Sequence, residues 1–344
     1  MVACYVKSLQ KRKMKRVGNL MSQIVTVENL MLAYYKACRG KRHKASVVSY
    51  SRNLYQNILM LRQQIIGGTM AVGEYHYFNI SDPKPRLICA ASFPERVLHH
   101  AIINICKPYF ERHLIYDTYA TRDNKGIYAA IARAQKAVKR YDYVAKLDVR
   151  KYFDSISHKI LKNRLERLFK DEALLRMLYR IIDSYSSSEG RGLPIGNLTS
   201  QYFANFYLSF CDHYIKECLH IPFYVRYMDD MLLFGETKEQ VREYVNRISK
   251  YLSEEYLLSL KCPQILRCSS GVSFLGYKLK RGYLMLNSRS KVRLKRKMCR
   301  CDKYYKEEIW DEATCYNRII PLLAFAKKAE THNLRSVVCR KLNS

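Results

Sequence analysis

The sequence predicts an α+β fold that combines a small antiparallel sheet with many helices. From residue 144 onward the expected order is a strand, helices, a long helix, a hairpin and a helix, which is typical of a split βαβ arrangement. The chain has 344 residues, 48% of them hydrophobic, and this is enough for a sizeable core and two or three subdomains.

The first 140 residues are expected to form helices interrupted by one pair of strands. Apolar residues recur at helical spacing, and the second helix ends at Gly67 and Gly68 because glycine favours helix ends. The strands Tyr75–Ile80 and Arg86–Ala91 are joined by a proline-rich turn with a basic tip. The helices are predicted over residues 28–38, 47–66, 94–110 and 127–140.

The rest of the chain supplies the main sheet. An apolar strand covers residues 144–149 and carries Asp148 near its end. A hairpin pairs residues 272–279 with residues 283–286 and turns at Lys280–Gly282. Helices are predicted over residues 158–169, 171–185, 198–218 and 238–252, and throughout the segment after Asn287.

The segment Tyr227–Asp230, Tyr-Met-Asp-Asp, is the most informative part of the chain. It lies between two apolar runs, which predicts a β-hairpin that lifts two carboxylates out of the sheet. The strand that ends at Asp148 can lie beside this turn, so that three carboxylates converge. Clustered carboxylates ionise together only with a cation, usually Mg²⁺, and the usual chemistry is phosphoryl transfer. A hydrated turn is the simpler interpretation.

The charge of the chain indicates a polyanionic partner. The 61 Lys and Arg residues against 30 Asp and Glu residues give a net charge of +31, which would repel itself unless a polyanion shared the surface. With 29 Tyr residues, such a surface can both neutralise phosphates and stack on bases. A basic protein of the membrane surface is the alternative, but no long amphipathic helix with a wide apolar face is visible.

The cysteines indicate a reducing compartment. None of the 12 Cys residues forms a C-x-x-C pair, and the closest pair, Cys299 and Cys301, has no histidine at ligand spacing, so zinc is not expected. The others lie in apolar runs typical of buried thiols. No apolar run reaches the length of a membrane span. The basic N-terminus lacks the apolar core of a signal peptide and is expected to be a flexible arm.

Five segments, in one order, resemble motifs of reverse transcriptases, and the resemblance covers about residues 75–286. Residues 146–153, which include Asp148, and residues 227–230 are similar to the two catalytic motifs of the palm. The remaining three resemble the nucleotide-pocket loop, a later palm motif and the primer grip, at residues 193–201, Lys261 and residues 274–277.

The resemblance implies a right-hand polymerase with fingers, a ferredoxin-like antiparallel palm and a short helical thumb. It divides the chain into a basic N-terminal arm with a helical extension, fingers, palm and thumb, over residues 1–74, 75–141, 142–286 and 287–344. Helices of the fingers are expected within the palm segment, at about residues 158–191.

Within this family the chain most resembles the enzymes of diversity-generating retroelements. Their pocket loop carries Ile-Gly-x-x-x-Ser-Gln, as at Ile195, Gly196, Ser200 and Gln201, whereas retron and group II intron enzymes usually carry Gln in place of this isoleucine. One departure is Gly126–Ala130, where the subgroup more often has Gly-Thr-His-Ala. Three further segments fit the subgroup, residues 82–86, 99–101 and 119–120.

The resemblance implies a two-metal site. Asp148 and Asp229 would bridge two Mg²⁺ ions, for which Mn²⁺ can substitute, and the Val149 carbonyl would assist. Asp230 would be the third acid, nearer the primer end. Two ions about 4 Å apart would activate the primer 3′-oxygen and stabilise the leaving oxygen.

The same resemblance implies phosphate contacts. Arg86 would grip the triphosphate through bidentate hydrogen bonds. Lys84 would assist, with a solvated turn lysine as the alternative. Lys261 would donate a proton to the departing pyrophosphate, or simply contact a phosphate.

Selectivity is implied by three pocket residues. Phe153 would leave no room for a ribose 2′-hydroxyl, so that the product is DNA; a core aromatic is the simpler interpretation. Ile195 and Gly196 would lie beside the template base and the incoming nucleotide. An aliphatic Ile195 makes no polar contact there, so a mispair loses less relative to a correct pair, and in the family this goes with errors opposite adenine. The simpler interpretation is that Ile195 only packs.

Primer and template would lie along the palm and thumb. Seven Lys and Arg residues occur between Arg289 and Arg300, and this helix would follow the duplex through its phosphates. A solvated charged face is the alternative. The residues expected at primer and template are Tyr227, Met228, Gly276, Arg289, Lys291 and Arg293.

The combined expectation is an RNA-directed DNA polymerase that makes error-prone, adenine-mutagenised cDNA from a retroelement template RNA, for mutagenic retrohoming. The implied partners are template RNA, cDNA primer and product, deoxynucleoside triphosphates and a small basic accessory protein that forms oligomers. The protein would be cytoplasmic, without membrane contact, and encoded by a bacterium, an archaeon or a phage.

Three other functions stay open. The first is a faithful retron-type or group II intron-type reverse transcriptase. The second is a non-catalytic RNA-binding protein that keeps the polymerase fold, and the third, more remote, is an RNA-templated RNA polymerase, which Phe153 opposes.

Overall fold

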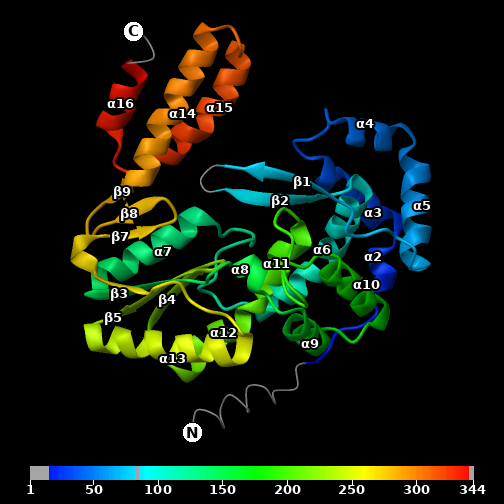
Figure 1. Cartoon of the computed structure of the whole chain (residues 1–344), viewed down its shortest axis with the longest axis horizontal. Coiled ribbons are helices and arrows are strands. Elements are labelled where there is room, and N and C mark those ends of the chain that lie inside the picture. The colour runs from blue at the N-terminus through cyan, green and yellow to red at the C-terminus, as the bar shows by residue number, and fades with distance from the viewer. Residues whose placement is uncertain (1–14, 82–84, 341–344) are drawn as a thin grey trace. The chain divides into compact units, whose positions relative to one another are not determined.

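The computed structural model describes residues 15–81 and 85–340 (Figure 1). The start of the predicted basic arm and the turn tip with Lys84 lie outside the described residues. The chain divides into two compact units. The first comprises residues up to 123, 148–220 and 246–261, and the second comprises residues 124–147, 221–245 and 262 to the end. The predicted boundaries of fingers, palm and thumb stay a prediction.

The first unit is helical apart from one hairpin. The strands β1 (Tyr75–Ile80) and β2 (Arg86–Ala91) pair antiparallel, with the bounds predicted from the sequence. The helices are α2 (Met21–Ile24), α3 (Val27–Cys38), α4 (Ala45–Arg52), α5 (Leu54–Ile66), α6 (Phe93–His113), α8 (Tyr152–Ser155), α9 (His158–Leu168), α10 (Glu172–Asp183), α11 (Leu198–Tyr207) and α12 (Ser209–His213), followed by the π turn η1 (Tyr214–Cys218).

Aromatic rings fill the core of this unit. The ring of Phe110, in α6, lies 5.7 Å from that of Phe169, 6.4 Å from that of Phe203 and 5.3 Å from that of Phe206, measured between centroids. All three contacts are edge-on, which is a favourable arrangement of aromatic quadrupoles. Phe110 therefore joins α6 to α11 and to the end of α9.

Two predicted helices of this unit are corrected. The helix expected over residues 47–66 is broken at Asn53 into α4 and α5. The side chain of Asn57 donates to the Tyr50 carbonyl at 2.8 Å, so this carbonyl does not need the bond from residue 54 that a continuous helix would make. The helix expected over residues 198–218 is divided at Leu208 and ends in the π turn.

The second unit holds two sheets. Strands β4 (Phe223–Tyr227), β5 (Asp230–Gly235), β3 (Tyr143–Asp148) and β6 (Gln264–Arg267) form the first sheet in the order β4-β5-β3-β6. Strands β7 (Val272–Phe274), β8 (Tyr277–Leu279) and β9 (Leu284–Leu286) form the second. The other elements are α7 (Ile127–Arg140), the start of α13 (Lys238–Tyr256), the 3-10 turn η2 (Cys268–Ser270), α14 (Ser288–Lys306), α15 (Glu312–Lys327) and α16 (His332–Arg340).

The four-stranded sheet confirms the predicted split βαβ arrangement. The pairs β4–β5 and β3–β6 are antiparallel, and β3 is central. The sequence analysis did not identify β6, which has only four residues, none of them buried. The strand expected over residues 272–279 is also corrected: it turns at Leu275 and Gly276, whose φ angles of 47° and 89° give a tight two-residue hairpin.

Helix α7 packs between the two sheets of this unit (Figure 1). The Arg133 guanidinium lies over the Phe223 ring of β4, 4.0 Å from its centroid. The Gln135 side chain donates to the Tyr283 carbonyl, just before β9, at 3.3 Å. No helix within the described ranges is long and apolar enough to cross a membrane.

Candidate functional site

The segment Tyr227–Asp230 forms the tight end of a hairpin in the second unit. Tyr227 pairs with Asp230, so only Met228 and Asp229 join β4 to β5. Met228 has a φ of 54°, in the left-handed region that residues with a side chain rarely adopt. Such strain persists only where the surroundings hold it, and it is typical of functional sites. The predicted hairpin is confirmed, but only Asp229 lies on its turn: Asp230, which was also expected to be lifted out of the sheet, is the first residue of β5.

A buried arginine supports this turn, and the sequence analysis did not identify it. Arg226, in β4, is 0% exposed, and its Nη1 donates to the Met228 carbonyl at 3.1 Å. Burying a charge is costly unless hydrogen bonds compensate for it, so a guanidinium beneath a strained turn points to a functional need. The only signal in the sequence was one arginine inside the apolar run Phe223–Tyr227.

A lysine accompanies the acid that begins β5. Asp230 is 24% exposed, and its Oδ2 lies 3.5 Å from Nζ of Lys146, in the neighbouring strand β3. In the sequence, Lys146 stands out only as part of the motif at residues 146–153, which indicates no role for it. A strand lysine usually directs its charge to water, whereas this one directs it to a carboxylate.

Asp148 is the last residue of β3 and belongs to the first unit. The Lys261 side chain donates to Asp148 Oδ1 at 2.6 Å, and the Lys261 backbone N–H donates to the Asp148 carbonyl at 2.8 Å. The Arg150 backbone N–H donates to the Ser259 carbonyl at 2.8 Å, and Val149, whose side chain is fully buried, lies between these contacts. The structure therefore brings together two predicted site residues, Asp148 and Lys261.

Divalent ions match the chemistry of these acids. Among the described side chains, in residues 15–81 and 85–336, no three His, Cys, Asp or Glu side chains lie close enough together to hold a metal ion. Ammonium groups contact two of the predicted ligands, Lys261 at Asp148 and Lys146 at Asp230. Both carboxylates thus already attract a cation, and their oxygens are the donors that Mg²⁺ prefers. The ligand set Asp148, Val149, Asp229 and Asp230 stays a prediction.

The predicted pocket loop lies against β2 in the first unit. The Cys89 backbone N–H donates to the Ile195 carbonyl at 2.8 Å, and the Ala91 N–H donates to Oδ1 of buried Asn197 at 3.4 Å. One backbone hydrogen bond and one hydrogen bond to the Asn197 side chain therefore fix residues 195–197 beside the strand that begins at Arg86. Strand β2 therefore connects two predicted nucleotide-binding residues: it begins at Arg86, and its Cys89 is hydrogen-bonded to Ile195.

Gly196 is required by this close approach. Its φ is 122°, and a Cβ added there would lie 2.8 Å from Cγ2 of Ile88 and 3.3 Å from the Cys89 carbonyl oxygen. Any larger residue would push the loop away from β2 or strain its backbone.

Phe153 lies near the same loop. It is half-buried in the short helix α8, and its carbonyl accepts a hydrogen bond from the Leu193 N–H at 2.9 Å. The residue that caps the start of this helix is Lys151, whose φ of 44° is again left-handed. The predicted sugar-selecting residue is thus tied to the start of the predicted pocket loop.

A comparison with known protein families shows to which family the chain belongs. The family described as "Reverse transcriptase (RNA-dependent DNA polymerase)" matches residues 81–279, more than half of the chain. The chain belongs to this family. This membership and the observed topology confirm the predicted α+β polymerase fold.

The similar members of the family are distant in sequence. The COX1/OXI3 intron 1 protein of Saccharomyces cerevisiae is 20% identical over 272 residues, which cover 75% of this chain and 31% of that protein. Protein YkfC of Escherichia coli is 22% identical over 193 residues, 51% of each chain. The chain thus spans 31% of the length of the first relative and 51% of the length of the second. A solved telomerase from Candida albicans superposes with a TM-score of 0.49 and 12% identity, over 77% of this chain and 56% of that chain.

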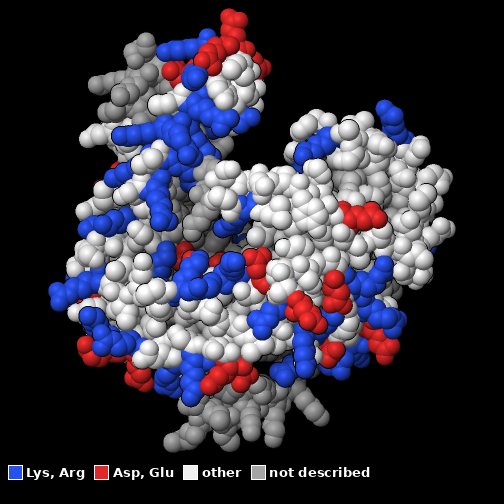
Figure 2. Space-filling model, viewed as in Figure 1, with Lys and Arg blue, Asp and Glu red and all other residues white. Residues whose placement is uncertain are grey.

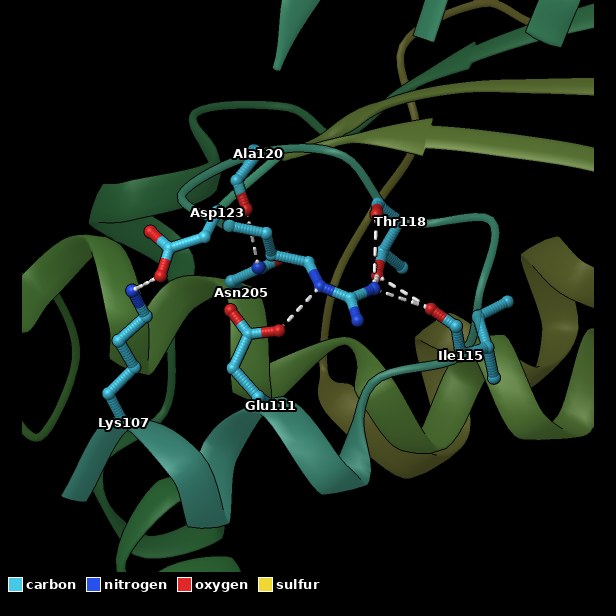
Figure 3. Close-up of polar contacts among 8 residues, drawn as sticks. Lys107, Glu111, Ile115, Thr118, Ala120, Asp123 and Asn205 are labelled. Atoms are coloured by element: carbon cyan, nitrogen blue, oxygen red, sulfur yellow. Dashed lines mark hydrogen bonds and ion pairs between the residues drawn. The ribbon is translucent and has the colours of Figure 1, made fainter. Parts of the chain in front are cut away.

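A polar network supports another segment of this reverse transcriptase fold, in the first unit (Figure 3). Arg122 donates to Glu111 at 2.8 Å, to the Ile115 carbonyl at 2.7 Å and to the Thr118 hydroxyl at 2.8 Å. The Asn205 side chain, in α11, donates to the Ala120 carbonyl at 2.9 Å. Charged and buried polar groups thus fix the loop after α6, which contains the Tyr119-Ala120 pair of the predicted subgroup.

The predicted thumb is a strongly basic helix. Helix α14 carries nine Lys and Arg residues and one acid, and Lys and Arg gather over it in the upper left of Figure 2. Arg289 is exposed and Lys291 half-exposed, whereas the Arg293 guanidinium lies 5.8 Å from the centroid of the Phe325 ring of α15. Whether Tyr227, Met228 and these basic residues contact primer and template stays a prediction.

Proposed function

We propose that the chain is an RNA-directed DNA polymerase in which Asp148, Asp229 and Asp230 carry nucleotidyl transfer with two divalent ions. The observation that carries the proposal is Asp229 on a strained two-residue turn, with Asp230 as the first residue of the next strand and buried Arg226 supporting the turn, in a member of the reverse transcriptase family. The third acid, Asp148, is supported within the first unit, where it ends β3 and accepts a hydrogen bond from the Lys261 side chain.

In this reaction the primer 3′-oxygen attacks the α-phosphorus of a nucleotide, and the bond to pyrophosphate breaks. Bound divalent ions supply charge neutralisation for the attacking and leaving oxygens. The role of the three carboxylates is to hold these ions. Arg86, Lys84 and Lys261 neutralise the triphosphate, and the direct contact of Lys261 with Asp148 supports its place near the reacting phosphates.

The pocket residues set which nucleotide is used. Phe153 excludes the ribose 2′-hydroxyl, so the product is DNA. Ile195 and Gly196 lie beside the nascent base pair, and Ile195 offers no polar side-chain group to it. On this basis we assign the enzyme to the error-prone type found in diversity-generating retroelements. Its partners are template RNA, a cDNA primer and a small basic accessory protein.

A second candidate, a group II intron-type reverse transcriptase, is favoured by one relative, the putative COX1/OXI3 intron 1 protein of Saccharomyces cerevisiae, whose name connects it with an intron. The two candidates differ in fidelity. Near-identical repeats beside the gene that differ at adenines support the error-prone type, whereas an intron RNA around the gene supports the second.

Asp229→Ala tests the proposed chemistry. Extension of a primer on an RNA template is expected to fall by at least about 1,000-fold, because a metal ion supplies several kcal/mol of stabilisation and about 1.4 kcal/mol corresponds to a factor of ten. Glu189→Gln, in an exposed loop, is the control and keeps the wild-type rate. Thermal unfolding checks that both variants fold. Extension by the alanine variant at a tenth of the wild-type rate, or no extension by the wild type, would remove the proposal.

A further inference from the structure

Lys146 holds a position that the proposed reaction does not explain. Its ammonium lies 3.5 Å from Asp230 Oδ2 and also donates to the Ser273 carbonyl, in β7, at 3.0 Å. All three residues belong to the second unit. Because an ammonium donates up to three hydrogen bonds and accepts none, a carboxylate and a carbonyl together suit its charged form.

The carbonyl partner leads into the predicted primer grip. Ser273 is followed by the turn at Leu275 and Gly276, and a Cβ added to Gly276 would lie 2.8 Å from Cζ of Phe325, in α15. The Tyr277 hydroxyl donates to the Phe325 carbonyl at 2.8 Å. A short chain of contacts thus runs from Asp230, through Lys146 and β7, to the helices that follow the sheet.

The side chain is enclosed enough for this contact to matter. The side chains of Lys146 and Asp230 are each 24% exposed. Lys278, on strand β8 of the second sheet, makes no ion pair with the described side chains of residues 15–81 and 85–336. Ion pairs at the open surface are weak, but partial burial reduces the screening by water and salt.

We propose that Lys146 is a positioning residue that serves as the internal counter-ion of Asp230 and ties this acid to the primer-grip sheet. The inference rests on the proposed function, since it gives Asp230 the role of a metal ligand. In the enzyme without a bound divalent ion, the ammonium neutralises the carboxylate and keeps it from repelling Asp229. A divalent ion then has to compete with this ammonium.

The competition is tested by Mn²⁺ binding to the full chain without nucleic acid, followed by electron paramagnetic resonance. Lys146→Met is expected to bind Mn²⁺ about tenfold more tightly than wild type. The reason is that one neighbouring positive charge lowers the affinity of a carboxylate for a proton by about tenfold or more, and we expect a similar effect on its affinity for a metal ion. Lys146→Arg keeps the charge and binds as wild type does. Lys278→Met, which also removes one positive charge, is the matched control and leaves binding unchanged.

Primer extension gives a second readout. The Mg²⁺ concentration for half-maximal rate falls in Lys146→Met, while KM for the primer–template rises, because β7 is no longer tied to Asp230. Equal or weaker Mn²⁺ binding by Lys146→Met, with Lys146→Arg folded and unchanged, would overturn the inference. Mn²⁺ binding that survives Asp230→Ala at wild-type strength would instead remove Asp230 as a ligand, and with it the proposed metal site.

Discussion

The pocket loop and the acid turn are held in place by different means. In the first unit, residues 195–197 are fixed by a backbone hydrogen bond from β2 to Ile195, by a hydrogen bond from β2 to the uncharged Asn197 side chain, and by a glycine that allows no side chain. In the second unit, the turn at Met228 and Asp229 is supported by charged side chains, from Arg226 below it and from Lys146 beside Asp230.

This difference teaches which properties a substitution can change. A side chain in the pocket can be replaced while the backbone keeps its path, so selectivity can vary without loss of the fold. The acid turn depends on two basic side chains, Arg226 and Lys146, so substitutions of these residues are expected to change the rate of primer extension and the binding of metal ions. Substitutions in the pocket loop and substitutions around the acid turn are therefore expected to have effects of different size and kind.

Arg226→Met should give the largest effect in this comparison. It leaves the half-buried Met228 carbonyl without its guanidinium donor, and a hydrogen bond to a charged group contributes about 1.5–3 kcal/mol. We expect kcat for primer extension to fall about 100-fold, which corresponds to about 2.7 kcal/mol, with KM for the nucleotide nearly unchanged.

The control for this change is Arg267→Met, in β6 of the same sheet, where the arginine is exposed. Arg226→Lys keeps the charge and should recover part of the rate. A folded Arg226→Met enzyme with wild-type kcat would show that the turn keeps its geometry by other means, and the contrast between the two regions would be lost.

The sequence predicted those features that depend on local patterns. The bounds of β1 and β2, the acidic hairpin and most helices follow from periodicity and from turn residues close in the chain. Asp148, Asp229 and Ile195 were identified because they lie in contiguous motifs.

Features that depend on distant partners could not be predicted. Lys146 meets a carbonyl 127 residues away, and nothing near it in the sequence indicates Ser273. The need for Gly196 arises from Ile88, and β6 is defined by its pairing with β3 and not by its own composition. Burial of Arg226 likewise becomes evident only when the sheet is assembled.

Phe153→Val should change sugar selectivity with an intermediate effect. The smaller side chain leaves room for a ribose 2′-hydroxyl, while the bond from the Leu193 N–H to the backbone carbonyl of residue 153 remains. The ratio of kcat/KM for a deoxynucleotide to that for the matching ribonucleotide is expected to fall about 30-fold, or about 2 kcal/mol. Phe78→Val, at an exposed aromatic of β1, is the control. An unchanged ratio would assign Phe153 to packing alone.

Ile195→Gln should give the smallest effect on rate and a specific effect on errors. The contact that fixes this residue is its carbonyl, which accepts from the Cys89 N–H, so any side chain leaves the loop in place. A glutamine amide restores polar discrimination beside the base pair, and misincorporation opposite template adenine should fall about fivefold, or about 1 kcal/mol. Sequencing of the cDNA measures this, with Ile195→Leu as the apolar control. If the glutamine and leucine variants give the same error spectrum, Ile195 only packs, and the assignment to the error-prone type loses its main support.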